Sequence, residues 1–341
     1  MKRTLVCWHA CVVAAAVATG CGFPPELDTP QLNANAGTNL QAYAASGTCR
    51  PGTYQGNVGH VGDKQFTLEC TVQGGVTVSA DPDQLARIRH IQVVQGTISV
   101  TGAVNLADAM PELKKCGAIG LTGGFTGTHF SAPASLEEAI GLTVEKTSQL
   151  LVISGFDKIP ALQSLRIKGN TALTEIGGFG QVATLPYLEI DGNPKLHTVK
   201  PFAKLTQGFS VVVKNSPALV QFPQLPLLAA LDKELVLNNL PTAQIDGFPQ
   251  LKTVPVLKIE GCPAVTKLVF PELGAVGTLW LHTVPSLTSL AEMPKLQISG
   301  QASVCVEAMS CTALEAFFTQ HTASKSPQAG MDCGAWVKCK P

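Results

Sequence analysis

Short apolar–polar–apolar triplets recur along most of this chain. In each triplet two aliphatic residues flank one outward residue, the alternation typical of a strand with one buried face. Between the first residues of successive triplets the intervals are 22, 21, 23, 23, 23, 23, 24, 22, 22 and 17 residues. The triplets occupy residues 76–78, 98–100, 119–121, 142–144, 165–167, 188–190, 211–213, 235–237, 257–259, 279–281 and 296–298.

Other positions repeat together with these strands. A proline stands six residues after the first strand position in five repeats, and proline cannot donate to a ladder, so this column marks the turn that leaves the sheet. Apolar residues recur eight and eleven residues after the same position. A unit this short cannot bury its own apolar side, so the units must stack around a shared interior. We therefore predict a mainly β fold, a parallel β-solenoid of about 11 coils of 21–24 residues over residues 76–300.

The first twenty residues predict export. A positive start precedes an apolar run from Leu5 to Val17, which is too short to cross a membrane and fits the core of a signal peptide. The run ends in Ala18-Thr19-Gly20-Cys21, which resembles the lipobox of bacterial lipoproteins, although that family more often has Leu at the position of Ala18. The resemblance implies a signal peptide over residues 1–20 and lipidation at Cys21. The alternative is ordinary cleavage near Gly20, which leaves Cys21 for a disulfide.

Composition limits which cellular compartment and which classes of partner we expect. Residues 21–48 are rich in Pro, Asn, Ala and Gly, so we expect a flexible tether behind the lipid. By resemblance to the bacterial sorting rule, Gly22 favours the outer membrane and the cell surface. Lys+Arg and Asp+Glu are equal at 24 each, which offers no basic footprint for nucleic acid. At 45% apolar residues the chain is also too hydrophobic to be disordered.

The cysteines are concentrated at the two ends of the repeats. An even number remains after the signal peptide and Cys21 are set aside, which in an exported chain indicates disulfides. We expect an N-terminal cap over residues 49–75 and a Cys-rich C-terminal cap over residues 301–341, which includes a short amphipathic helix over residues 312–320. The disulfide candidates of the caps are Cys49, Cys70, Cys305, Cys311, Cys333 and Cys339.

Two further cysteines lie within the repeats. Cys116 and Cys262 are about six coils apart, on the order of 29 Å at the usual strand spacing, so they cannot pair with each other. Their chemical state stays open at this point.

The coil sequence resembles a known family of repeats. The segments Leu-Gln-Ser-Leu-Arg-Ile-Lys-Gly-Asn-Thr-Ala-Leu at 162–173 and Leu-Pro-Tyr-Leu-Glu-Ile-Asp-Gly-Asn-Pro-Lys-Leu at 185–196 resemble leucine-rich repeats. One additional residue between the Asn and the next Leu brings them closer to the receptor L domain of growth-factor receptors. This resemblance, over about residues 76–300, implies a right-handed solenoid that serves as a binding scaffold.

The outward strand positions hold the most informative surface residues. One column carries opposite charges in successive coils, from Glu145 to Lys214, and Arg166 and Glu189 add a pair beside it; register fixing is the simplest role of such pairs. The adjacent column is apolar in the later coils and ends in a tryptophan. Two roles are open for this tryptophan: a surface on which a sugar or a protein binds, or packing under the C-terminal cap. The residues of this predicted binding face are Trp280, His282, Lys258, Glu260, Val236 and Val212.

The sequence offers little that predicts catalysis. The carboxylates do not recur as a cluster in adjacent coils, the histidines lack metal-ligand spacing, and no nucleophile elbow is present. We therefore expect no enzyme, no cofactor and no metal, but a lipoprotein that recognises a protein or a glycan at the cell surface. The alternatives are a structural envelope protein without a specific ligand and a carbohydrate-active β-helix enzyme.

Overall fold

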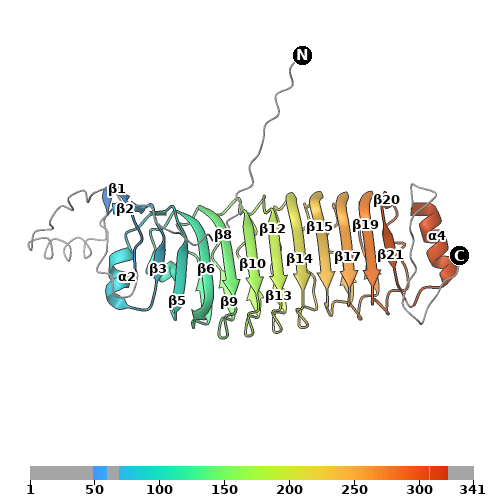
Figure 1. Cartoon of the computed structure of the whole chain (residues 1–341), viewed down its shortest axis with the longest axis horizontal. Helices are drawn as coiled ribbons and strands as arrows, with labels where there is room; N and C mark the ends of the chain where they lie inside the picture. The colour runs from blue at the N-terminus through green and yellow to red at the C-terminus, as the bar shows by residue number, and fades with distance from the viewer. Residues whose placement is uncertain (1–48, 60–68, 307, 322–341) are drawn as a thin grey trace, which may run out of the picture.

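The chain folds into one rod of stacked coils (Figure 1). A computed structural model of the protein describes residues 49–59, 69–306 and 308–321. Each coil adds to a 15-stranded sheet in which neighbouring strands run parallel. Aliphatic side chains from every coil fill one continuous interior. The predicted parallel β-solenoid is thus confirmed.

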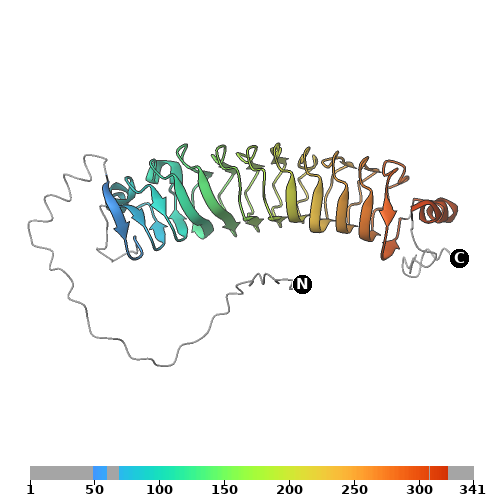
Figure 2. The same cartoon turned by 90° about the horizontal axis from the view of Figure 1, so that it is seen from above.

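Strands of the large sheet follow one another along the rod (Figure 2). They are β1 (Arg50–Tyr54), β2 (Glu69–Val72), β3 (Val76–Val78), β4 (Val93–Val94), β5 (Ile98–Gly102), β6 (Lys115–Phe125), β8 (Glu138–Glu145), β10 (Ser164–Lys168), β12 (Tyr187–Asp191), β14 (Gln207–Lys214), β15 (Ala230–Asn238), β17 (Thr253–Glu260), β19 (Ala275–His282), β20 (Gln297–Ile298) and β21 (Ala302–Val304).

Shorter strands, half a coil later, form two narrower parallel sheets. The first contains β7 (His129–Ser131), β9 (Val152–Ser154), β11 (Glu175–Ile176) and β13 (Thr198–Val199), and the second contains β16 (Gln244–Ile245) and β18 (Lys267–Leu268). The helices are α2 (Pro82–Ile88), α3 (Leu106–Ala109) and α4 (Cys311–His321).

Strand register confirms the central columns of the repeat. Leu165 pairs with Leu188, and Val211, Leu235 and Leu257 follow in the same row. All five side chains are buried. The repeat interval therefore places equivalent residues on top of one another, as stacking around a shared interior requires.

The last predicted triplet, residues 296–298, has its two apolar residues buried and contains strand β20, but it does not belong to the column of the other triplets. Ile298 pairs with Val276 near the start of β19, whereas Leu279 pairs with Ala302 of β21. The interval from 279 to 302 is 23 residues, so this coil has the usual length. The predicted interval of 17 residues ended at a residue of a different column. The error arose because the strand entry is itself apolar, and Leu296 and Ile298 repeat the same alternation there.

In seven successive coils the chain leaves the large sheet through a residue whose backbone is in the left-handed region. Successive coils place their turn residue at φ between 52° and 68°. Glycine and asparagine hold most of these positions, because they adopt this conformation at the least steric cost. The turn residues are Lys146, Gly169, Gly192, Asn215, Asn239, Gly261 and Thr283.

The N-terminal end of the sheet begins before the repeat that the sequence made visible. Strands β1 and β2, within the segment assigned to the N-terminal cap, already belong to the large sheet. A disulfide joins Cys49 to Cys70, with 5.0 Å between the Cα atoms. The two candidate cysteines of the N-terminal cap are thus confirmed as a disulfide, and the bond fixes the first two strands to each other.

At the C-terminal end, α4 follows the last strand (Figure 1). The predicted helix is confirmed, and Leu314, Phe317 and Phe318 join the apolar interior, so the helix covers the end of the rod. Cys305 and Cys311 are both disulfide-bonded. Within the described ranges, no helix has the length and hydropathy needed to span a membrane.

Several predictions fall on other parts of the chain. The signal peptide (1–20), the lipidation site Cys21, the tether (21–48), and Cys333 and Cys339 lie outside the described residues.

Candidate binding face of the large sheet

The predicted face residues lie on the outward side of four neighbouring strands, β14, β15, β17 and β19. Val212, Val236, Lys258 and Trp280 occupy one register row. Two residues further along the strands, Glu260 pairs with His282 in a second row. Parallel in-register pairing sets these side chains about 4.8 Å apart along the rod.

Trp280 is the centre of a small packed cluster. Its ring stacks on His282 at 4.2 Å between centroids, and the Lys258 Nζ lies 5.3 Å from the indole centroid. Lys258 also pairs with Glu260 at 2.9 Å, and His282 Nε2 lies 2.8 Å from Ser303 Oγ. The indole nitrogen of Trp280 is buried and has no hydrogen-bond partner within the described part of the chain. Trp280 is thus half-buried against side chains of its own strand and of the preceding strand; the sequence had left open whether its ring forms a platform or packs under the C-terminal cap.

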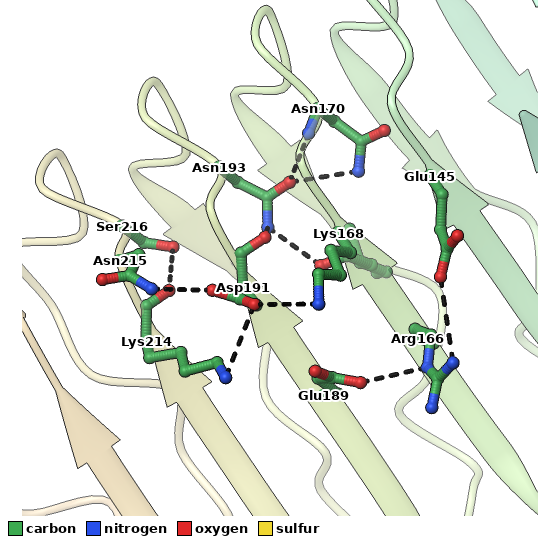
Figure 3. A network of polar contacts seen from close by, with 11 residues as sticks. Glu145, Arg166, Lys168, Asn170, Glu189, Asp191, Asn193, Lys214, Asn215 and Ser216 are labelled. Carbon is green, nitrogen blue, oxygen red and sulfur yellow. Dashed lines mark hydrogen bonds and ion pairs between the residues drawn. The ribbon is translucent and has the colours of Figure 1, made fainter. Parts of the chain in front are cut away.

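Further toward the N-terminus, ion pairs join the outward residues across strands (Figure 3). The Arg166 guanidinium lies between two carboxylates, 3.0 Å from Glu189 and 3.9 Å from Glu145. The expected pair between Arg166 and Glu189 is confirmed. Glu145 is beside Lys168 in register, as predicted, but its ion pair is with Arg166.

Asp191 lies between two lysines in the neighbouring column. Its carboxylate is 3.4 Å from Lys168 Nζ and 3.5 Å from Lys214 Nζ, and it accepts a hydrogen bond from the Asn215 amide at 2.9 Å (Figure 3). Burial acts to raise the pKa of Asp191, but the Asn215 amide and the two lysines outweigh it, so the pKa falls below its ordinary value. The carboxylate therefore stays ionised and holds three strands in register.

An asparagine ladder runs beneath this charged surface. Asn193 Oδ1 accepts hydrogen bonds from the backbone N–H and the side-chain amide of Asn170, each at 3.0 Å. Asn170 Oδ1 in turn accepts from the N–H and hydroxyl of Thr147. Both asparagines are fully buried. The ladder satisfies the turn groups that a tight bend leaves without strand partners.

Cys262 stands at the equivalent turn position three coils beyond Asn193. Its thiol donates to the Glu260 carbonyl at 3.4 Å, and backbone N–H groups of Leu240 and Asn239 face its sulfur. Burial raises the pKa of Cys262, against the lowering effect of those N–H groups. Cys116 lies buried in the apolar entry column, where desolvation raises its pKa to about 12. Both cysteines are free thiols, which settles the question that the sequence left open.

A hollow of about 670 Å³ lies on the outward face over β8 to β15. Val212 and Val236, two predicted face residues, line it together with Tyr187. The Tyr187 side chain is 51% exposed, and its register neighbours are the small residues Ser164 and Ser210. Sequence reasoning missed Tyr187, although a lone aromatic among Gly and Ser at this outward position was visible in the repeat.

A second recess, of about 600 Å³, lies where the narrower sheet is interrupted between β13 and β16. Val220, which lines it, is 62% exposed. In the two preceding coils, Gly177 and Lys200 donate their N–H groups to the coil before them. Pro223 stands one repeat after Lys200 and has no N–H to donate, so the ladder ends there.

The described residues contain no group of three or more His, Cys, Asp or Glu side chains that could hold a metal ion. No protein-family model matches the chain, and a search of curated proteins found no match.

Proposed function

We propose that this protein is an exported lipoprotein whose solenoid recognises a macromolecule of the bacterial cell surface, a protein or a glycan. The binding face is the outward side of the large sheet from β8 to β19. Support for the anchor comes from the lipobox-like Ala18-Thr19-Gly20-Cys21. Support for the coil type comes from the segments at 162–173 and 185–196, whose spacing resembles that of the receptor L domain.

The ordered outward columns of the large sheet are the observation on which this proposal depends. Ion pairs link residues of successive strands, so their side chains are already held in place before a ligand arrives. Preorganised groups lose less conformational entropy on binding than free ones do. The hollow beside them gives a ligand a place where part of its surface is enclosed.

Lysine substitutions on the two sides of the rod test which side binds. Val212→Lys and Val236→Lys each place a new charge in the hollow, and Val220→Lys places the same charge at the second recess. Immobilised full-length variants would be incubated with solubilised bacterial envelope, untreated or protease-digested. We expect the first two variants to lose the bound material and Val220→Lys to retain it. Equal binding by all three variants would exclude the part of the large-sheet face that contains the hollow.

The anchor needs a separate test. Cys21→Ser should abolish incorporation of an alkyne-labelled fatty acid and release the protein from the membrane fraction. Labelling that persists in Cys21→Ser would refute lipidation at that residue.

A further inference from the structure

The hollow over β8 to β15 has the dimensions of a site for a small or slender ligand. Its volume of about 670 Å³ lies within the range of about 300–1,000 Å³ that small-molecule pockets occupy. A stable protein interface needs about 800 Å² on each partner and an apolar centre. Tyr187 is the one large hydrophobic side chain lining the hollow that is more than a third exposed. This combination favours a polar ligand of small cross-section over a protein surface.

The charges of the hollow favour a neutral ligand. Four charged side chains line it, and each takes part in an ion pair. They are Arg166, Glu189, Lys214 and Glu234. Glu234 pairs with Lys233 at 2.8 Å and also accepts a hydrogen bond from Ser210 at 3.0 Å. An anionic or cationic ligand would compete with these pairs for the opposite charge, whereas hydroxyl groups can add to them without displacing a charge.

Tyr187 supplies an apolar surface at the centre of this polar lining. Ser164 and Ser210 on either side are too small to cover it, so its ring stands clear of the sheet. Phe209 supports it, with ring centroids 5.3 Å apart. An aromatic face among hydroxyl- and carboxylate-bearing side chains matches a sugar ring, which has one apolar C–H face and a rim of hydroxyl groups.

The strand spacing fits a ligand that repeats along the rod. Equivalent side chains stand about 4.8 Å apart in successive strands. A hexopyranose in an extended β-linked chain advances by nearly the same distance. We propose that the hollow binds a neutral, extended β-linked oligosaccharide that runs along the rod over β8 to β15, with one sugar ring on Tyr187. This proposal rests on the proposed function and names the ligand class of its binding face.

Direct titration of sugars into the full-length protein tests the assignment. The probes are cellohexaose, chitohexaose, and a hexamer of a uronic acid that carries a charge on every ring. We expect at least one neutral hexamer to bind, more tightly than its own disaccharide, and the charged hexamer to bind more weakly. Tyr187→Ala should raise the Kd about tenfold or more, because it removes the stacking surface.

Two further variants separate loss of stacking from loss of fold. Tyr187→Phe keeps the ring and should retain most of the affinity, and Val220→Ala removes an exposed side chain outside the hollow and should not change it. Failure of both neutral hexamers to bind overturns the proposal, and so does binding that Tyr187→Ala leaves unchanged. If envelope material is still captured and Val212→Lys still abolishes capture, the proposed function stands and only the sugar assignment falls.

Discussion

Removal of Asn193 from the buried ladder gives the sharpest test of how the coils are held together. Asn193→Ala deletes the oxygen that accepts from the backbone N–H of Asn170, and no other described residue replaces it. It also deletes the amide that donates to the Ile167 carbonyl at 3.0 Å. Because both asparagines are fully buried, water cannot take over these contacts without opening the turn.

The magnitude follows mainly from the Asn170 N–H and the Ile167 carbonyl, because the Asn170 amide keeps its bond to the Val144 carbonyl and the Asn193 bond to the Asp191 carbonyl is longer, at 3.3 Å. An orphaned buried N–H costs about 1–3 kcal/mol, and the hydrogen bond to Ile167 contributes about 1 kcal/mol. We therefore expect Asn193→Ala to lower the free energy of unfolding by about 2–4 kcal/mol. The matched control is Asn238→Ala: the Asn238 side chain is half-buried, and its hydrogen bond within the described part of the chain is to the Glu260 side chain, at 3.1 Å, so its loss should cost about 0.5 kcal/mol or less.

Urea unfolding followed by far-ultraviolet circular dichroism measures both variants. A double-mutant cycle with Asn170→Ala adds a second check, since Asn170 and Asn193 share hydrogen bonds and their effects should be less than additive. If Asn193→Ala costs no more than Asn238→Ala, the ladder does not stabilise the coils and the reasoning is refuted. Strict additivity would show that the two asparagines act independently.

Three other predictions follow from local features. The pKa of Asp191 is lowered in the fold. Its stabilising contribution is therefore present above its ordinary pKa of 3.8 and is lost as the pH falls through the folded pKa. Asp191→Asn should make the free energy of unfolding depend less on pH in this range. Cys116 and Cys262 should resist iodoacetamide at pH 8 and react in urea, as mapped by mass spectrometry; native labelling of Cys116 would contradict its pKa of about 12. Gly178 has φ of 88°, and an added Cβ would meet backbone atoms at 2.8 Å, so Gly178→Ala should lower the free energy of unfolding by more than about 1 kcal/mol. Gly180→Ala, where a Cβ meets open space, should leave the free energy of unfolding unchanged. Urea titration measures both variants.

The apolar repeat could be read from the chain because each coil obeys the same local requirement. Residues such as Leu165 and Leu188 must face inward wherever a coil stacks on another, so their spacing alone identifies them. The same reasoning failed at the last coil. There Leu296 and Ile298 satisfy the pattern at the strand entry, and only the pairing of Leu279 with Ala302 shows which column continues.

The candidate site was only partly accessible to such reasoning. The sequence identified the outward columns and placed Val212 and Val236 on the face that contains the hollow. It left the role of Trp280 open between a platform and packing, and the structure adds the contacts with His282 and Lys258 that half-bury the ring. Tyr187 was overlooked, although the repeat aligns it with Gly141, Ser164 and Ser210, the small residues that leave it exposed.

What the sequence determined alone is the coil: its length, its buried columns and the place of its turn, together with the candidate cysteines at the two ends of the repeats. These follow from burial and backbone geometry, which impose the same requirement on every repeat and therefore produce a periodic pattern in the sequence. The tertiary structure decided which charged residue pairs with which, where the narrower sheet breaks, and where the face is hollowed. Such features join residues of different coils through side-chain shape and reach, and two coils with the same apolar pattern can differ in all of them.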